Sequence, residues 1–175
     1  MALKETTAPM VTIRPADPPR DAGAVTDIYA HHVLHGTGTF EEAPPGPAEM
    51  AGRMTRVLSR GWPWLVAEDA GAVVGYAYAA QFRDRSAYRY SCEDSIYVRS
   101  DATGRGIGGR LLAALMEASH AAGFRRMYAV IGDADNLGSI LLHRRMGFAD
   151  AGVLRAIGYK FDRWLDVVFM QKLLP

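Results

Sequence analysis

The segment from Thr103 to Leu112 combines glycines and cations in a pattern that could bind a phosphate group. Its glycines are Gly104, Gly106, Gly108 and Gly109. They run into an apolar segment of helical period, so we place them at the start of a helix. The first amide groups of a helix lack intrahelical partners and lie at the positive end of its dipole. A diphosphate can approach glycine backbone closely, and Arg105 and Arg110 add cationic donors. The pattern predicts an anion-binding loop, with a plain strand-to-helix turn as the alternative.

Glu93 is the candidate general base. It begins the segment 93–98, whose β-branched and aromatic residues predict the strand that leads into the loop. A carboxylate at that place can take a proton from a bound substrate, directly or through a water. The alternative is a structural ion pair with Arg85 or Arg89. Asp94 faces the other way on a regular strand, so we expect only Glu93 of the two to serve the site.

Two other phosphate-binding motifs fit the chain poorly. A Walker loop ends in Gly-Lys-Ser/Thr, whereas residues 109–111 read Gly-Arg-Leu. The dinucleotide-binding fingerprint requires an acidic residue about twenty positions further on. Residues 123–126, near that place, read Gly-Phe-Arg-Arg. Neither class of nucleotide-binding protein is favoured.

Residues 103–108 resemble the coenzyme A loop of the GCN5-related N-acetyltransferases, written Arg/Gln-x-x-Gly-x-Gly/Ala. Thr103 departs from that motif. Because backbone amides hold the pyrophosphate in such loops, we expect weaker or re-routed anchoring rather than lost binding. Residues 136–148 are similar to a second segment of the family, Asn-x-x-Ser/Ala-x-x-Leu/Phe-Tyr/His-x-x-x-Gly-Phe. The resemblance implies the acyl-CoA N-acyltransferase (GNAT) fold from about residue 11 to residue 173.

Six segments resemble the phosphinothricin and methionine sulfoximine acetyltransferases within that superfamily. They are residues 38–40, 64–68, 75–78, 85–88, 93–98 and 158–167. The last segment lies outside the shared coenzyme A machinery, so it favours this subfamily specifically. In such enzymes the part corresponding to residues 160–164 lies near a dimer interface, and the resemblance therefore implies a homodimer.

The resemblance implies a site that uses acetyl-CoA as co-substrate and no metal. It also implies that Glu93 is the base that removes a proton from an amine before the amine attacks the thioester carbonyl, directly or through a water. Its expected cofactor-binding residues are Ile96, Tyr97, Val98, Gly104, Arg105, Gly106, Ile107, Gly108, Gly109 and Asn136. Backbone N–H groups of the strand would also stabilise the oxyanion of the reaction. Asn136 could instead cap the helix that follows, or do both. His143 stands where the superfamily often has a tyrosine that protonates the departing thiolate, and a helix-surface histidine is an equally open interpretation.

The loop before the central strand is expected to bind the amine substrate. The expected substrate-binding residues are Phe40, Arg83, Arg85, Tyr88, Glu93 and Ser95. A forked contact from Arg83 or Arg85, together with Tyr88, would neutralise a substrate carboxylate. A solvated basic loop is the alternative. Phe40, Tyr90 and Trp164 could line the pocket, although a loop-stapling role for Phe40 and core packing of Trp164 stay open.

The elements that must position these residues alternate between strands and helices. Strands are expected over residues 11–14, 62–68, 72–80, 93–98, 127–131, 148–154 and 165–173. Helices are expected from Asp21, after a break at Pro18 and Pro19, from Pro47, and over residues 108–122 and 137–146. This order predicts an α/β fold with one mixed, mostly antiparallel sheet and helices on both faces.

Composition limits the remaining classes of protein. The chain has 175 residues, 49% hydrophobic and 22% charged, which indicates one globular domain over residues 11–175 after a flexible extension of residues 1–10. A formal net charge of +1 gives no basic surface for nucleic acid. We find no apolar run long enough to span a membrane, and one cysteine suits a reducing cytoplasm, the expected location. The cluster His31, His32 and His35 lacks further ligands at metal-binding spacing.

These features predict an N-acetyltransferase that moves acetyl from acetyl-CoA directly to the α-amino group of a small amino-acid analogue. Phosphinothricin, methionine sulfoximine and methionine sulfone are the expected substrates. Transfer through Cys92 is disfavoured because no histidine partner is visible beside it. Peptide N-termini stay open as substrates, and so does a non-catalytic acyl-CoA-binding sensor. A polyamine or aminoglycoside is disfavoured because the substrate loop is basic.

Overall fold

The computed structural model describes residues 11–175, and the predicted flexible extension over residues 1–10 lies outside this range. Within it, seven strands form one sheet in the order β1-β2-β3-β4-β5-β7-β6. The strands are β1 (Thr12–Pro15), β2 (Trp64–Asp69), β3 (Ala72–Gln81), β4 (Ser91–Val98), β5 (Arg126–Gly132), β6 (Ala149–Lys160) and β7 (Arg163–Leu173). The α-helices are α1 (Pro18–His35), α2 (Pro47–Leu58), α3 (Ile107–Ala121) and α4 (Leu137–Arg145), with short 3-10 turns η1 (Ser86–Tyr88) and η2 (Ser100–Ala102). None of these helices has both the length and the hydropathy needed to cross a membrane.

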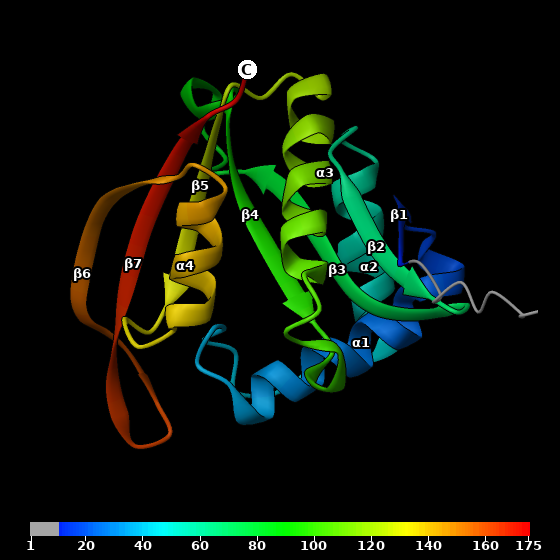
Figure 1. Ribbon diagram of the computed structural model, residues 1–175, viewed down its shortest axis with the longest axis horizontal. Helices are drawn as coiled ribbons and strands as arrows, with labels where there is room; N and C mark the ends of the chain where they lie inside the picture. The colour runs from blue at the N-terminus through cyan, green and yellow to red at the C-terminus, as the bar shows by residue number, and fades with distance from the viewer. Residues whose placement is uncertain (1–10) are drawn as a thin grey trace, which may run out of the picture.

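The sheet is mixed and mostly antiparallel. Strands β4 and β5 run parallel, and the other neighbouring strands of the described chain pair antiparallel. Helices α3 and α4 cover one face of the sheet, and α1 and α2 lie on the other (Figure 1). The predicted α/β architecture with helices on both faces is confirmed.

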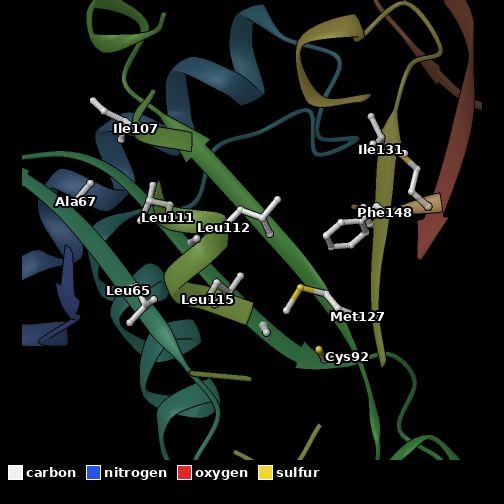
Figure 2. Packing of buried hydrophobic residues seen from close by; sticks show 14 of the residues in the cluster. Leu65, Ala67, Cys92, Ile107, Leu111, Leu112, Leu115, Met127, Ile131 and Phe148 are labelled. Atoms are coloured by element: carbon white, nitrogen blue, oxygen red, sulfur yellow. The ribbon is translucent and has the colours of Figure 1, made fainter. Parts of the chain in front are cut away.

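Alternation along β2 sends side chains into two separate cores. Leu65 and Ala67 join the core under α3, whereas Trp64 and Val66 join the core under α1 and α2. Helix α3 contributes an apolar stripe, each member at most 2% exposed: Ile107, Leu111, Leu112 and Leu115. Figure 2 shows this stripe packed against side chains of the strands. Burial of the stripe fixes the helix on the sheet, and its first residue, Ile107, fixes the glycine loop that precedes it.

Helix α1 begins at Pro18 rather than at the predicted Asp21. The expected break at Pro18 and Pro19 is wrong because a proline in the first turn loses only an N–H group that has no helical partner. Asp21 is 1% exposed and accepts hydrogen bonds from Arg14 at 2.7 Å and from the Asp17 N–H at 2.8 Å. This carboxylate therefore ties the start of α1 to β1.

Strands β6 and β7 form a longer hairpin than predicted. Strand β6 runs to Lys160 and β7 starts at Arg163, and the hairpin projects from the edge of the sheet (Figure 1). Most of β6 is exposed, and bulges interrupt its pairing between Asp150 and Gly152 and between Leu154 and Gly158. A strand that buries neither face has no alternating apolar pattern, so sequence reasoning ended it too early.

Candidate active site

A gap opens in the sheet between β4 and β5. The strands pair only along Ser91–Asp94 and Arg126–Ala129, although both continue further. A cleft of about 710 Å³ lies there, lined by Ser95–Val98 of β4 and by Val130 and Ile131 of β5. Backbone groups on these edges lack a neighbouring strand, so an extended ligand can supply their hydrogen-bond partners.

The glycine loop forms one end of this cleft. Gly104 and Gly106 each have a φ of 75°, a conformation that favours glycine, and Gly106 directly precedes α3. No side chain caps the first amide groups of α3, so these N–H groups are available to an anion. The lining residues of the loop are Thr103, Gly104, Gly106, Ile107, Gly108 and Gly109. The predicted position of the loop at a helix start is confirmed.

The two arginines of the loop do not line the cleft. Arg105 donates a hydrogen bond to Asp69 at 2.7 Å, and Arg110 donates to the backbone oxygen of Val11. Both guanidinium groups are thus held by intramolecular partners, contrary to the expectation that they add donors to the loop. The loop offers an anion mainly its backbone N–H groups.

Asn136 caps α4 and also lines the cleft. Its Oδ1 accepts a hydrogen bond from the Ser139 N–H at 3.3 Å, so the helix-cap interpretation is confirmed. Its Nδ2 lies 3.5 Å from the backbone oxygen of Gly132. Because the cap uses Oδ1 and the amide nitrogen carries two N–H groups, capping is compatible with donation to a ligand in the cleft.

Asp94 and His143 form a buried pair that sequence reasoning missed. Asp94 faces away from Glu93, as predicted, but it lines the cleft. His143 Nε2 donates to Asp94 Oδ2 at 3.0 Å, and Nδ1 donates to the Ser139 carbonyl at 2.7 Å. His143 is only 3% exposed, so the helix-surface interpretation is wrong. Burial lowers the pKa of His143, but the hydrogen bond and charge of Asp94 outweigh burial and raise the pKa overall.

Glu93 lies on the other face of β4, beside Arg83. The Glu93 Oε2 and Arg83 Nη1 atoms are 3.5 Å apart, and the Glu93 side chain is 34% exposed. Arg83 therefore takes the place of the expected partners Arg85 and Arg89. Burial raises the pKa of Glu93 above its ordinary value, and Arg83 offsets only part of that shift. A carboxylate with a raised pKa and access to solvent is suited to take a proton.

Gln81 orders the loop that carries Arg83 and Arg85. Its Nε2 donates to the backbone oxygens of Arg83 at 2.6 Å and of Arg85 at 3.2 Å. Tyr88 lies in η1, with its ring 5.9 Å from that of Phe82. The structure brings Arg83 to Glu93, whereas Arg85 and Tyr88 are exposed on the same loop. Ser95 lies opposite Tyr78 in the sheet register and lines the cleft.

Lys160 holds the loop that follows α1, another feature that sequence reasoning missed. Its ammonium group is buried and donates to the backbone oxygens of Gly36 and Thr39, each at 2.9 Å. The same loop carries Phe40, whose ring occupies the space beside Gly158. A Cβ atom on Gly158 would overlap that ring, so any other residue there would displace Phe40. The β6–β7 hairpin thereby fixes one wall of the cleft.

The three predicted wall residues and the cysteine do not line the cleft. Phe40, Tyr90 and Trp164 are 38%, 53% and 65% exposed, so core packing of Trp164 is also wrong. Cys92 is fully buried, and burial raises its pKa to about 12, which makes it a poor nucleophile. Within residues 11–175, no group of three or more His, Cys, Asp or Glu side chains is placed to hold a metal ion. His32 of the histidine cluster instead donates to the Val98 carbonyl at 2.9 Å.

Comparison with known proteins defines the class of this chain. The model of the Acetyltransferase (GNAT) family matches residues 38–148, which is more than half of the chain. The chain therefore belongs to the GNAT acetyltransferase family, and it is an enzyme of the acetyltransferase class.

Several members of the family are similar to this chain over most of its length. The chain is 49% identical over 152 residues to a phosphinothricin N-acetyltransferase from Alcaligenes faecalis, covering 87% of this chain and 77% of the relative. It is 40% identical over 158 residues to an L-methionine sulfoximine/L-methionine sulfone acetyltransferase from Pseudomonas paraeruginosa, covering 87% and 91%. A crystal structure of a phosphinothricin acetyltransferase from Sinorhizobium meliloti in complex with AcCoA aligns with a TM-score of 0.91 at 49% identity, covering 94% of this chain and 88% of that one.

Replacing Lys160 by Met should destabilise the protein. The buried carbonyl oxygen of Thr39 and the part-buried one of Gly36 lose their donor, so we expect the free energy of unfolding to fall by about 1–3 kcal/mol. Urea denaturation followed by tryptophan fluorescence measures the change. The control is Lys172→Met on β7, a partly exposed lysine whose replacement should change stability by less than about 0.5 kcal/mol. An equal loss of unfolding free energy for the two substitutions would show that the Lys160 contacts stabilise the protein no more than a partly exposed lysine does.

Proposed function

We propose that this enzyme transfers the acetyl group of acetyl-CoA to the α-amino group of a small amino-acid analogue such as phosphinothricin, methionine sulfoximine or methionine sulfone. The observation that carries the proposal is the geometry at the start of the gap. There, one strand turns Asp94 into the cofactor-sized cleft and turns Glu93 to the opposite face. The names of the relatives support this substrate class. The single buried cysteine suits the cytoplasmic location that we propose.

We place acetyl-CoA in the cleft between β4 and β5. The first N–H groups of α3 and the glycine loop would hold its diphosphate. The backbone edge of Ile96, Tyr97 and Val98 would hold the pantetheine arm in the manner of an added strand. Asn136 would donate to that arm from the other side of the gap. Thr103 weakens the anchoring only modestly in this scheme, because the diphosphate contacts come from backbone rather than from side chains.

The proposed chemistry is direct attack on the thioester. Glu93 removes a proton from the substrate ammonium group, directly or through a water, and the free amine then attacks the carbonyl carbon. The negative charge that develops on the carbonyl oxygen is stabilised by backbone N–H groups on the diverging edge of β4. The carbon–sulfur bond breaks, the attacking nitrogen loses its second proton to leave a neutral amide, and coenzyme A leaves as a thiolate that takes up that proton. This route uses a carboxylate base and needs no metal.

Charge at the substrate loop favours a free amino acid. A zwitterionic substrate carries a carboxylate close to its amine, and the loop presents Arg83 beside Glu93 and an exposed Arg85 two residues further on. An arginine can bind a carboxylate through two parallel hydrogen bonds. Tyr88 and Ser95 would add polar contacts, and Phe40 would face the apolar part of the side chain. A peptide N-terminus lacks a carboxylate at that distance, so it uses this loop less well.

We further propose that the enzyme is a homodimer. The β6–β7 hairpin exposes large apolar side chains that a monomer would leave in water: Ile157, Tyr159, Phe161 and Trp164 are each at least 50% exposed. The β6–β7 hairpin of one subunit would pack against the same hairpin of the other subunit across a two-fold axis, which makes the interface isologous.

Charged residues on the hairpin should break the dimer. The double change Tyr159→Lys and Trp164→Lys should convert the protein to a monomer in light scattering, because burying two ammonium groups at an interface is costly. The control is Leu34→Lys on α1, which is 50% exposed and lies off the hairpin, and should leave the dimer intact. A monomeric wild type would refute the assembly.

Replacing Glu93 by Gln should slow turnover strongly. Removal of a general base typically costs about 10²–10⁴-fold in kcat. Binding of acetyl-CoA, measured by calorimetry, should stay within about threefold of wild type because the cleft is unchanged. Glu117→Gln on the exposed side of α3 is the control and should leave both quantities unchanged. Normal kcat for Glu93→Gln across the whole pH range would exclude Glu93 as the base.

Replacing Arg83 should shift the pH dependence of kcat, whereas replacing Arg85 should not. Activity requires ionised Glu93, so kcat falls as pH drops through the raised pKa of this residue. Arg83 lowers that pKa, so Arg83→Met should raise it further and move the acidic limb of the kcat profile to higher pH. Arg85→Met removes a cation from the same loop and should raise the KM for the amino acid without moving the limb. An unshifted limb in Arg83→Met would contradict the assignment.

A further inference from the structure

The Asp94–His143 pair joins two elements on opposite sides of the cleft. Asp94 is the last residue of β4 that pairs with β5, so it marks the point from which the strands diverge. His143 lies on α4, and their side chains are 2% and 4% exposed. The pair therefore spans the inner end of the gap, on the face opposite Glu93.

Both ring nitrogens of His143 already face a protein oxygen. Nδ1 lies 2.7 Å from the Ser139 carbonyl oxygen and Nε2 lies 3.0 Å from Asp94 Oδ2. A carbonyl and a carboxylate accept hydrogen bonds, so a proton on either nitrogen points to one of these oxygens rather than into the cleft. Phe148 packs edge-on against the ring at 5.0 Å between centroids. No ring N–H is left to point toward a departing thiolate.

Helix α4 depends on this pair for its position. It has nine residues, and only Ile140 and His143 among them are buried. It nevertheless forms a wall of the cleft through Gly138, Ser139, Leu142 and His143. Leu142 also packs against Gly108 of the glycine loop, since a Cβ atom added to Gly108 would lie 3.3 Å from the Leu142 side chain. Loss of the Asp94 contact would therefore loosen both the gap and the end of the loop.

We propose that Asp94 is a positioning residue that, through His143, clamps α4 to β4 and sets the width of the coenzyme A cleft, and that His143 does not donate a proton in the reaction. This inference rests on the proposed function, because it assigns the cleft to acetyl-CoA. It replaces the proton-donor role that the family resemblance suggested for His143. The clamp acts on cofactor affinity rather than on bond making and breaking.

The test compares Asp94→Ala, Asp94→Asn and wild type. For Asp94→Ala we expect the Kd of acetyl-CoA to rise about tenfold or more, while kcat at saturating acetyl-CoA stays within about threefold. Asp94→Asn keeps an amide oxygen that can accept the His143 N–H, so it should restore most of the affinity. The matched control is Leu141→Ala, an exposed α4 residue that does not line the cleft, and it should change neither constant. A fall in kcat of about a hundredfold with unchanged Kd would overturn the proposal in favour of a chemical role.

Hydrogen exchange tests the clamp without any ligand. Amides of α4 should exchange about tenfold faster in Asp94→Ala than in wild type, because the helix loses the hydrogen bond that joins His143 to β4. Unchanged exchange would overturn the proposal. If Asp94→Ala does not fold, His143→Gln is measured in the same way, and a larger change in kcat than in Kd would again overturn it. Since exchange needs no activity, a wild type that fails to acetylate any amine would refute the proposed function and leave this test of the clamp intact.

Discussion

The structure depends on one constraint, the divergence of two parallel strands after Asp94 and Ala129. A sheet that simply continued there would satisfy its own backbone, and no cleft would form. Divergence leaves the edge of β4 without a partner strand, and the glycine loop and the start of α3 lie at the end of that edge. The core under α3 holds this arrangement because Ile107, Leu111, Leu112 and Leu115 lock the helix against β2, β3 and β4. A ligand that completes the sheet and also carries an anion is the natural occupant, and a coenzyme A thioester has both features.

The alternation of a β-strand then separates two chemical tasks. Glu93 and Arg83 lie on one face of β4, and Asp94 and His143 lie on the other. In the proposed reaction, an amine therefore meets Glu93 without displacing the cofactor. Lys160, from the hairpin at the far edge of the sheet, fixes the loop that bears Phe40. The proposed acceptor side is thus built from segments distant in sequence, whereas the proposed cofactor side is built from β4, β5, α3 and α4.

Sequence-based prediction succeeded for features that depend on residues close together in the chain. The glycine loop, the stripe of α3, the strand 93–98 and the cap at Asn136 follow from short-range rules, and the structure contains all of them. It failed where partners are far apart in the chain. Nothing local indicates that Arg105 binds Asp69, that Asp94 meets His143, or that Lys160 reaches the Gly36 carbonyl. The dismissal of Asp94 shows the limit most clearly, because alternation correctly gave its direction but could not show that the cleft lies on that face. The end of β6 was misplaced because an exposed hairpin leaves no burial pattern to follow.

A free-thiol assay of the wild-type protein with acetyl-CoA tests the central claim most directly. Methionine sulfoximine, phosphinothricin and a short peptide with a free N-terminus are supplied in parallel, with acetyl-CoA binding measured on the same preparation. The account predicts thiol release that depends on an amino-acid analogue and that exceeds release with the peptide. Acetyl-CoA binding without release for either analogue, or faster release with the peptide, would contradict it.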